Sequence, residues 1–149
     1  MNSESFAKIC AAPSAHGVGQ LVLHFEWCPK YKYSMLRQDR FKDFLANVLE
    51  DESRKRGCGI IEIGIEDDNV HLVVGLRPTL SVSYVFHQLK GKSAYELFRF
   101  APKFRLRYLR GDFWSPGKFY RSVGDVDVET TRRYVKAQDH RQRTLFNVM

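Results

Sequence analysis

The first part of the chain alternates between apolar and polar residues, which is the pattern of a strand with one buried face. In residues 19–27 large apolar side chains take every second place, at Leu21, Leu23, Phe25 and Trp27. His24 and Glu26 lie between them and are therefore expected to point to the opposite face. Pro29 ends the strand, because proline has no N–H to donate to a neighbouring strand.

Two further strands are predicted in the middle of the chain. In residues 58–66 the expected inward set is Ile61, Ile63 and Ile65, with Glu62 and Glu66 outward. Asp67 and Asp68 favour a tight turn. Residues 69–76 then form a third strand, whose inward set is Val70, Leu72, Val74 and Leu76. Asn69 and His71 are expected on the opposite face of this strand.

Apolar residues at helical spacing predict the helices. The first covers about residues 39–56, and Gly57 stops it. A short second helix begins at about residue 82 with Thr79 or Ser81 as its N-cap, and residues 90–100 add another helical piece. After a fourth strand in residues 118–124, a final helix starts near Asp127 and runs through residue 143.

The predicted order is strand, helix, strand, strand, helix, strand, helix. This order is typical of the ferredoxin-like split β-α-β sandwich, an α+β fold. We expect an antiparallel sheet with helices on one face and an added C-terminal helix that carries a tyrosine. Residues 1–16 are expected to be an N-terminal tail, and residues 17–149 a single domain, since 149 residues suffice for one core.

The second face of the predicted sheet is polar. His24, Glu62 and His71 all point to it, and something must cover this face or use it. The final helix is the candidate, because its apolar and polar residues form one stripe at helical spacing: Val128, Thr131, Tyr134, Val135 and Gln138. Tyr134 and Gln138 are four residues apart and project together. Taken alone, each is also compatible with a packing tyrosine and a surface amide, and His71 with an ordinary strand histidine.

The composition excludes several classes of protein. No apolar stretch reaches the roughly 20 residues of a membrane span. The chain has 3 cysteines without a CxxC pair, so the sequence offers neither a zinc ribbon nor a disulfide framework. We expect a protein of the reducing cytoplasm.

Positive charge indicates a polyanionic partner, nucleic acid before membrane. The chain has 24 Lys and Arg against 17 Asp and Glu, a net charge of +7. Basic and aromatic residues interleave in residues 95–122, which suits a single strand, because cations contact phosphates and rings stack on bases. Each ring there is equally compatible with a place in the core. The candidate nucleic-acid contacts are Lys30, Lys32, Arg37, Lys90, Lys92, Arg105, Arg107 and Arg110.

Five segments, in this order, resemble the IS200-type transposases, which are small single-tyrosine HUH endonucleases of bacterial and archaeal insertion sequences. The segments are LVLHFEWCPKYKY, DDNVHLVV, LKGKSAYELF, FWSPGKFYRSVG and YVKAQ. The resemblance extends from about Gly17 to Gln138. It implies a transposase that nicks and rejoins single-stranded DNA, at the hairpin ends of an insertion sequence, through a 5′-phosphotyrosine and without ATP.

The resemblance also implies roles for individual residues. Tyr134 matches the nucleophile. In the family a Mg²⁺ or Mn²⁺ ion is held by a histidine-hydrophobic-histidine strand and by a glutamine one turn after the tyrosine. The implied metal ligands are therefore His71, Gln138 and Asn69, the last at the position of the other histidine. The family pattern further implies a homodimer in which the tyrosine helix of one subunit can complete the site of the other.

Asn69 departs from the family pattern. An amide oxygen can bind Mg²⁺ or Mn²⁺ but is a weaker ligand than imidazole. Three explanations stay open: a site with a weaker ion completed by Asp67 or a DNA phosphate, a degenerate relative, or an introduced change at this position. We expect reduced or conditional activity. Two other functions also remain open, a ferredoxin-like module that binds hairpin DNA or RNA without catalysis and, against the positive charge, a small-ligand regulatory domain.

Overall fold

The computed structural model describes residues 21–117, 119–124 and 127–141, and the predicted N-terminal tail lies outside them. The elements in chain order are β1 (Leu21–Trp27), α2 (Asp39–Lys55), β2 (Gly59–Ile65), β3 (Val70–Leu76), α3 (Val82–Phe100), β4 (Phe119–Val123) and α4 (Val128–Ala137). Short turns at Lys30–Lys32 and Pro102–Leu106 follow β1 and α3. The predicted order of strands and helices is confirmed.

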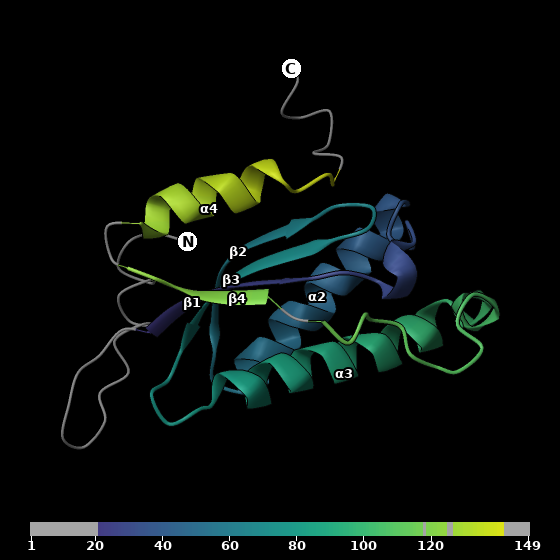
Figure 1. Cartoon of the computed structure of the whole chain (residues 1–149), viewed down its shortest axis with the longest axis horizontal. Coiled ribbons are helices and arrows are strands. Elements are labelled where there is room, and N and C mark those ends of the chain that lie inside the picture. Colours follow the sequence, from purple (N-terminus) through teal and green to yellow (C-terminus); the bar gives the residue numbers. More distant parts are fainter. Residues whose placement is uncertain (1–20, 118, 125–126, 142–149) are drawn as a thin grey trace.

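The four strands form one antiparallel sheet in the order β2-β3-β1-β4. This is the strand order of the ferredoxin-like fold, and the predicted α+β class is confirmed. Helices α2 and α3 cover one face of the sheet, and α4 lies across the other face (Figure 1). The polar second face that the sequence predicts is therefore the face beneath α4.

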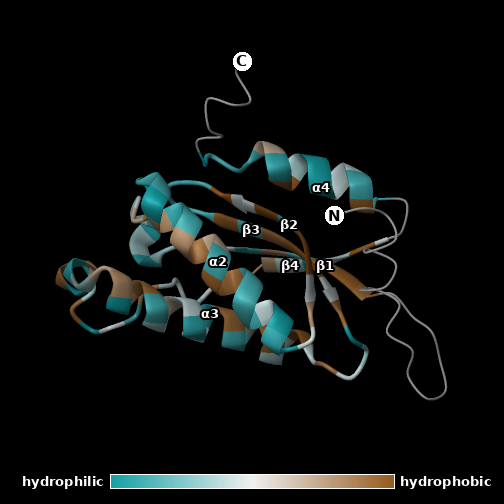
Figure 2. Ribbon diagram, turned by 180° about the vertical axis from the view of Figure 1, so that it is seen from behind, coloured by the Kyte–Doolittle hydropathy of each residue, from teal (hydrophilic) through white to brown (hydrophobic). Residues whose placement is uncertain are grey.

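The main core lies between the sheet and the helices α2 and α3. Apolar side chains of β1 and β3 pack there against one stripe of each helix, and among the fully buried ones are Phe25, Leu45, Leu72, Phe86 and Leu89. Figure 2 shows the apolar strands between the helices and the hydrophilic outer side of α2. This packing fixes the sheet as a rigid platform for the face under α4.

A second and smaller apolar cluster holds α4 on the sheet. It consists of Val22, Ile61, Val73, Val123, Val128 and Val135. The inward prediction for Ile61 is wrong, because the β2–β3 register shifts between Ile60 and Glu62 and turns Ile61 toward α4. Such an extra residue in one strand reverses the facing of the residues before it.

Two helices differ from their predicted bounds. The two predicted pieces after residue 82 form one helix of 19 residues, α3, capped by the Ser81 hydroxyl, which accepts from the Tyr84 N–H. The final helix ends at Ala137, six residues before the predicted residue 143, because the chain then bonds to β2. None of the described helices is long and apolar enough to cross a membrane.

Candidate active site

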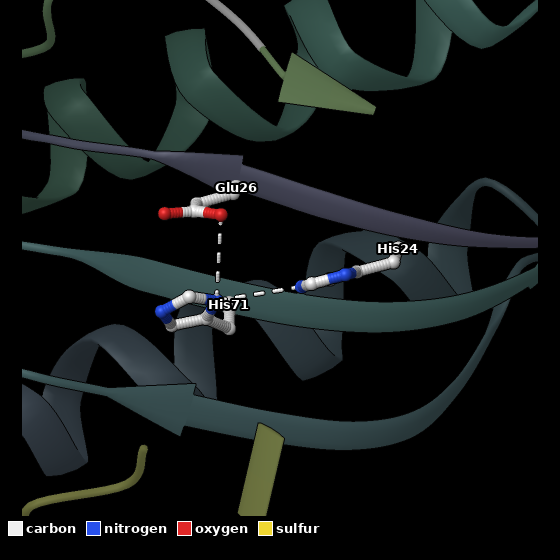
Figure 3. A group of neighbouring side chains, drawn as sticks. All are labelled: His24, Glu26 and His71. Carbon is white, nitrogen blue, oxygen red and sulfur yellow. Dashed lines mark hydrogen bonds and ion pairs between the residues drawn. The ribbon is translucent and has the colours of Figure 1, made fainter. Parts of the chain in front are cut away.

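Two buried histidines face each other beneath α4. His24 comes from the middle of β1 and His71 from the start of β3, and the antiparallel register places them diagonally across the two strands. His24 Nε2 lies 3.4 Å from His71 Nδ1, and the two rings are stacked. Only 3% and 2% of these residues is exposed. Figure 3 shows both rings pointing into the same space between the strands.

Three polar side chains surround the His71 ring. Glu26, directly opposite on β1, has Oε2 3.8 Å from His71 Nδ1. Glu66 has Oε1 3.0 Å from His71 Nε2. The amide nitrogen of Asn69 lies 3.2 Å from the same Nε2 and donates to Glu26 Oε1 over 2.9 Å. Each nitrogen of His71 therefore has a carboxylate beside it.

His24 is neutral in this environment. Burial lowers the pKa of His24 to about 4, and electrostatic interactions with His71 and Arg121 act in the same direction. Its Nδ1 has no hydrogen-bond partner among the described residues. A neutral imidazole has one nitrogen with a free lone pair, which is the form that binds metal ions. His24, Glu26 and His71 together form a group that could hold a divalent ion.

Tyr134 lies beside the two histidines, on the outer face of the site. Its ring meets the edges of both, with centroid distances of 5.9 Å to His71 and 6.2 Å to His24. Half of its surface is exposed to solvent, unlike its neighbour Val135, which is fully buried. The helix α4 is therefore anchored through Val135 and leaves the phenol of Tyr134 exposed to solvent.

The other two metal ligands expected from the resemblance lie after Tyr134 on α4 and beside His71 on the sheet. Gln138 is the C-cap residue of α4, one turn after Tyr134, and its N–H donates to the Tyr134 carbonyl oxygen. Asn69 lies next to His71, but its Oδ1 accepts from the Val70 N–H, so the amide nitrogen faces His71. Asp67, considered as an additional ligand, instead bonds the buried Lys42 of α2. The structure thus brings His71, Asn69 and Tyr134 together.

Sequence reasoning missed Glu26 and Glu66 as site residues and did not give His24 a chemical role. Strand alternation already places His24 and Glu26 on the polar face. The alternation does not predict the cross-strand register, which places Glu26 opposite His71. Glu62, which also faces α4, has another role, since its carboxylate pairs with Arg132 over 3.2 Å.

Several of the predicted nucleic-acid contacts gather beyond the end of β1. Lys30, Arg107 and Arg110 line one concave region of about 210 Å³ together with Tyr31 and Tyr108. The Arg107 guanidinium lies 4.5 Å from the Tyr33 ring. The neighbouring Lys32 is exposed. This surface lies at the end of the sheet where Glu26 and His71 are found, since Lys30 follows β1 directly.

The remaining basic candidates are more dispersed. Lys90 donates to the carbonyl oxygens of Ser115 and Gly117, and Lys92 pairs with Glu96. Arg105 stacks on Phe98, whereas Arg37 is exposed just before α2. The rings of the basic and aromatic stretch are divided between core and surface. Phe98 and Trp114 are buried and Phe100 stacks on Phe44, whereas Tyr95, Phe119 and Tyr120 are exposed. Arg121 was not predicted as a contact. It lies directly opposite His24 in the register of β1 and β4, on the face covered by α4.

Comparison with known proteins gives consistent matches over most of the chain. The family model described as "Transposase IS200 like" matches residues 17–138. The ISDra2 transposase TnpA of Deinococcus radiodurans is 26% identical over 125 residues, which are 84% of this chain and 89% of that protein. The transposase for insertion sequence element IS200 of Salmonella typhimurium is 24% identical and covers 83% of this chain and 80% of that protein.

Solved structures agree on the fold. A protein of Deinococcus radiodurans R1, provisionally assigned as a transposase, superposes with a TM-score of 0.71 at 25% identity, over 86% of this chain and 98% of that one. A REP-associated tyrosine transposase bound to a REP hairpin superposes with a TM-score of 0.54 at 13% identity, over 77% and 62% of the two chains. The second likeness concerns the fold alone. With its ferredoxin-like sheet and a family match over residues 17–138, the chain belongs to the IS200-like transposase family.

Proposed function

We propose that this protein nicks and rejoins single-stranded DNA at the ends of an insertion sequence, with Tyr134 as the nucleophile. The observation that carries the proposal is the position of the Tyr134 ring, edge-on to His71 at 5.9 Å and to His24 at 6.2 Å, in a chain of a transposase family. Family membership supports DNA transposition, and the geometry supports the assignment of the tyrosine.

The chemistry follows from the properties of a phenol. The Tyr134 oxygen attacks the scissile phosphorus, the bond to the 3′ oxygen breaks, and a 5′-phosphotyrosine and a free 3′-hydroxyl result. The phenol loses its proton to solvent, which reaches half of the side chain, and the leaving 3′ oxygen takes up a proton. Because a phenolate leaves more readily than an alkoxide, a 3′-hydroxyl can attack the same phosphorus and rejoin the strands. The phosphodiester energy is retained, so no ATP is required.

The donor atoms around His71 fit a divalent cation, Mg²⁺ or Mn²⁺. Two imidazole nitrogens 3.4 Å apart and a carboxylate oxygen 3.8 Å from one of them face a common space. A cation bound there would supply polarisation of the phosphate and neutralise developing negative charge. His71 is the central ligand in this proposal. The family pattern suggests Gln138 and Asn69 as further ligands, but Asn69 turns its amide nitrogen, which has no lone pair to give, toward His71.

The DNA strand is proposed to approach along the basic end of the sheet. Lys30, Arg107 and Arg110 line the same concave region as Tyr31, whose exposed ring can stack on a base. The other proposed phosphate contacts are Lys32, Arg37, Lys90, Lys92 and Arg105. Arg121 is added to them, because it is exposed on the face of α4 and opposite His24.

A homodimer is part of this proposal. Within one chain Tyr134 already lies beside His71, which supports a site completed by a single subunit. Exchange of α4 between two identical subunits would reproduce the same contacts on the partner's sheet and would give a composite site.

The decisive experiment uses a labelled single-stranded oligonucleotide that carries the end of the element, incubated with the full chain and Mn²⁺. The wild type is expected to form a covalent protein–DNA adduct that survives denaturation, and Tyr134→Phe is expected to form none. Tyr120→Phe is the control, because Tyr120 is similarly exposed but lies on β4. An adduct of undiminished yield with Tyr134→Phe would disprove the nucleophile. Metal-independent hairpin binding without any adduct would instead support the binding module.

A further inference from the structure

Glu66 determines which nitrogen of His71 is available to a metal ion. A carboxylate only accepts hydrogen bonds, so the 3.0 Å contact between Glu66 Oε1 and His71 Nε2 requires the proton on Nε2. The Asn69 amide nitrogen near the same Nε2 is itself a donor and accepts nothing from it. In the neutral ring, which is the form that binds a metal ion, the lone pair of His71 therefore lies on Nδ1. Histidines that bind metals commonly donate their other N–H to a carboxylate in this way.

The Nδ1 side of His71 holds two further donor atoms. His24 Nε2 lies at 3.4 Å and Glu26 Oε2 at 3.8 Å from Nδ1. Ligands bound at about 2.0–2.2 Å to one tetrahedral or octahedral ion are roughly 3.0–3.6 Å apart. The three atoms lie within 4.8 Å of one another, so shared coordination requires a closing movement, and Glu26, with a third of its side chain exposed, is free to make it.

Asn69 holds the Glu26 carboxylate in this position. Its Oδ1 is engaged by the Val70 N–H at 3.1 Å, which fixes the plane of the amide. Its Nδ2 then donates to Glu26 Oε1 over 2.9 Å, which leaves Oε2 turned toward His71 Nδ1. A histidine at position 69 has no side-chain amide and could not accept from the Val70 N–H and donate to Glu26 through one such group.

We propose that the divalent cation binds on the Nδ1 side of His71, to His71 Nδ1, His24 Nε2 and Glu26 Oε2. Asn69 is a positioning residue for Glu26 in this site. The Glu26 carboxylate supplies a negative charge, which the histidine of the family pattern at position 69 would not supply. The inference rests on the proposed function, because the Tyr134 ring contacts both imidazoles. Two imidazoles and one carboxylate favour Mn²⁺ over Mg²⁺, which prefers an all-oxygen shell.

The test is calorimetric titration of the full chain with Mn²⁺ in the absence of DNA. Glu26→Gln and His24→Gln are each expected to weaken Mn²⁺ binding at least tenfold, and His71→Ala to abolish it. Mg²⁺ is expected to bind at least tenfold more weakly than Mn²⁺. Glu62→Gln is the matched control, since Glu62 lies on the same face but pairs with Arg132, and it should bind like the wild type. Circular dichroism melting identifies any variant that does not fold.

The outcomes separate this inference from the proposed function. Unchanged Mn²⁺ binding by Glu26→Gln and His24→Gln, together with loss of binding in Gln138→Ala, would overturn this cation site. The proposed nicking activity would not be contradicted by that result. Absence of Mn²⁺ binding by the wild type would also overturn it. The expected binding pattern without any DNA adduct would support the cation site and contradict the proposed function.

The role of Asn69 is tested by a double-mutant cycle in the same titration. In the wild-type background, Asn69→Ala is expected to weaken Mn²⁺ binding severalfold. In the Glu26→Gln background it is expected to have no further effect, because Asn69 acts on the cation only through Glu26. An equal loss in both backgrounds would identify Asn69 as a ligand and overturn the positioning role.

Discussion

At the scale of single residues, Gly64 determines how closely the tyrosine helix approaches the sheet. Gly64 pairs with His71 across β2 and β3 and lies beneath Val135 of α4. A Cβ atom at position 64 would lie 2.2 Å from the Val135 carbonyl oxygen, a backbone atom that cannot rotate away. The short distance between the Tyr134 phenol and the two imidazoles therefore depends on a missing side chain in a neighbouring strand.

Gly64→Ala is expected to displace α4 and separate Tyr134 from His71. We expect the yield of the covalent DNA adduct to fall at least tenfold and the free energy of unfolding to decrease by about 1–3 kcal/mol, as for other overpacked sites. Denaturant unfolding and the oligonucleotide assay measure the two effects. Gly91→Ala is the control, because a Cβ atom there meets nothing within 4 Å and helix propensity favours alanine. Full activity and stability in Gly64→Ala would contradict the close contact.

At the scale of elements, α4 is held on the sheet by apolar side chains along the helix and by hydrogen bonds just after its last turn. Val128 and Val135 bury its apolar side in the small cluster under the helix. After its last turn, Asp139 accepts from the Ile65 N–H at the end of β2, and the His140 N–H donates to the Ile65 carbonyl oxygen. The Asp139 side chain is 3% exposed and also pairs with Arg141. These bonds fix the rotation of α4 and with it the direction of Tyr134.

Asp139→Ala is expected to loosen the C-terminal end of α4 without unfolding the sheet. The Ile65 N–H loses its acceptor, so we expect a loss of about 1–2 kcal/mol in local stability. Hydrogen exchange should become faster in residues 128–137 and at Ile65, while α2 and α3 remain unchanged. Asp127→Ala serves for comparison, because Asp127 makes no side-chain bond as the N-cap of α4. Equal exchange in both variants would show that the Asp139 contact does not hold the helix.

At the scale of the whole molecule, the site and the basic surface lie at the same end of the sheet. Glu26 and His71 lie at the end of β1 and the start of β3, and Lys30 continues from β1 into the surface with Tyr31, Arg107 and Arg110. With a net charge of +7, the protein attracts polyanions in general. The local concentration of cations and exposed rings at this end is what would align a single strand with Tyr134.

Arg107→Ala is expected to weaken the binding of single-stranded DNA roughly threefold to tenfold at moderate salt. Loss of one phosphate contact should also reduce the slope of log affinity against log salt by about 1. Fluorescence anisotropy at several salt concentrations measures both quantities. Arg54→Ala is the control, since Arg54 is also charged and exposed but lies near the end of α2, close to the opposite end of the strands. Parallel losses in the two variants would indicate a nonspecific charge effect.

Strand alternation and helical spacing were sufficient to predict much of this protein. They gave the order of the elements, the inward face of β3 and the shared face of His24 and His71, because these depend on the local periodicity of the chain. They failed at Ile61, where an extra residue in β2 shifts the register, and at the end of α4, where Asp139 and His140 bond to Ile65. Neither the register shift nor these hydrogen bonds can be recognised from the local pattern of apolar and polar residues.

The amino-acid sequence by itself determined the ferredoxin-like order of elements, the positive charge, the family and the candidate nucleophile Tyr134. Only the tertiary structure decided which polar atoms meet, since the pairing of Glu26 with His71 and the orientation of the Asn69 amide arise from contacts between strands about 45 residues apart. Periodicity fixes the face on which a side chain lies, whereas cross-strand register and hydrogen bonds fix its neighbours and the atom it presents.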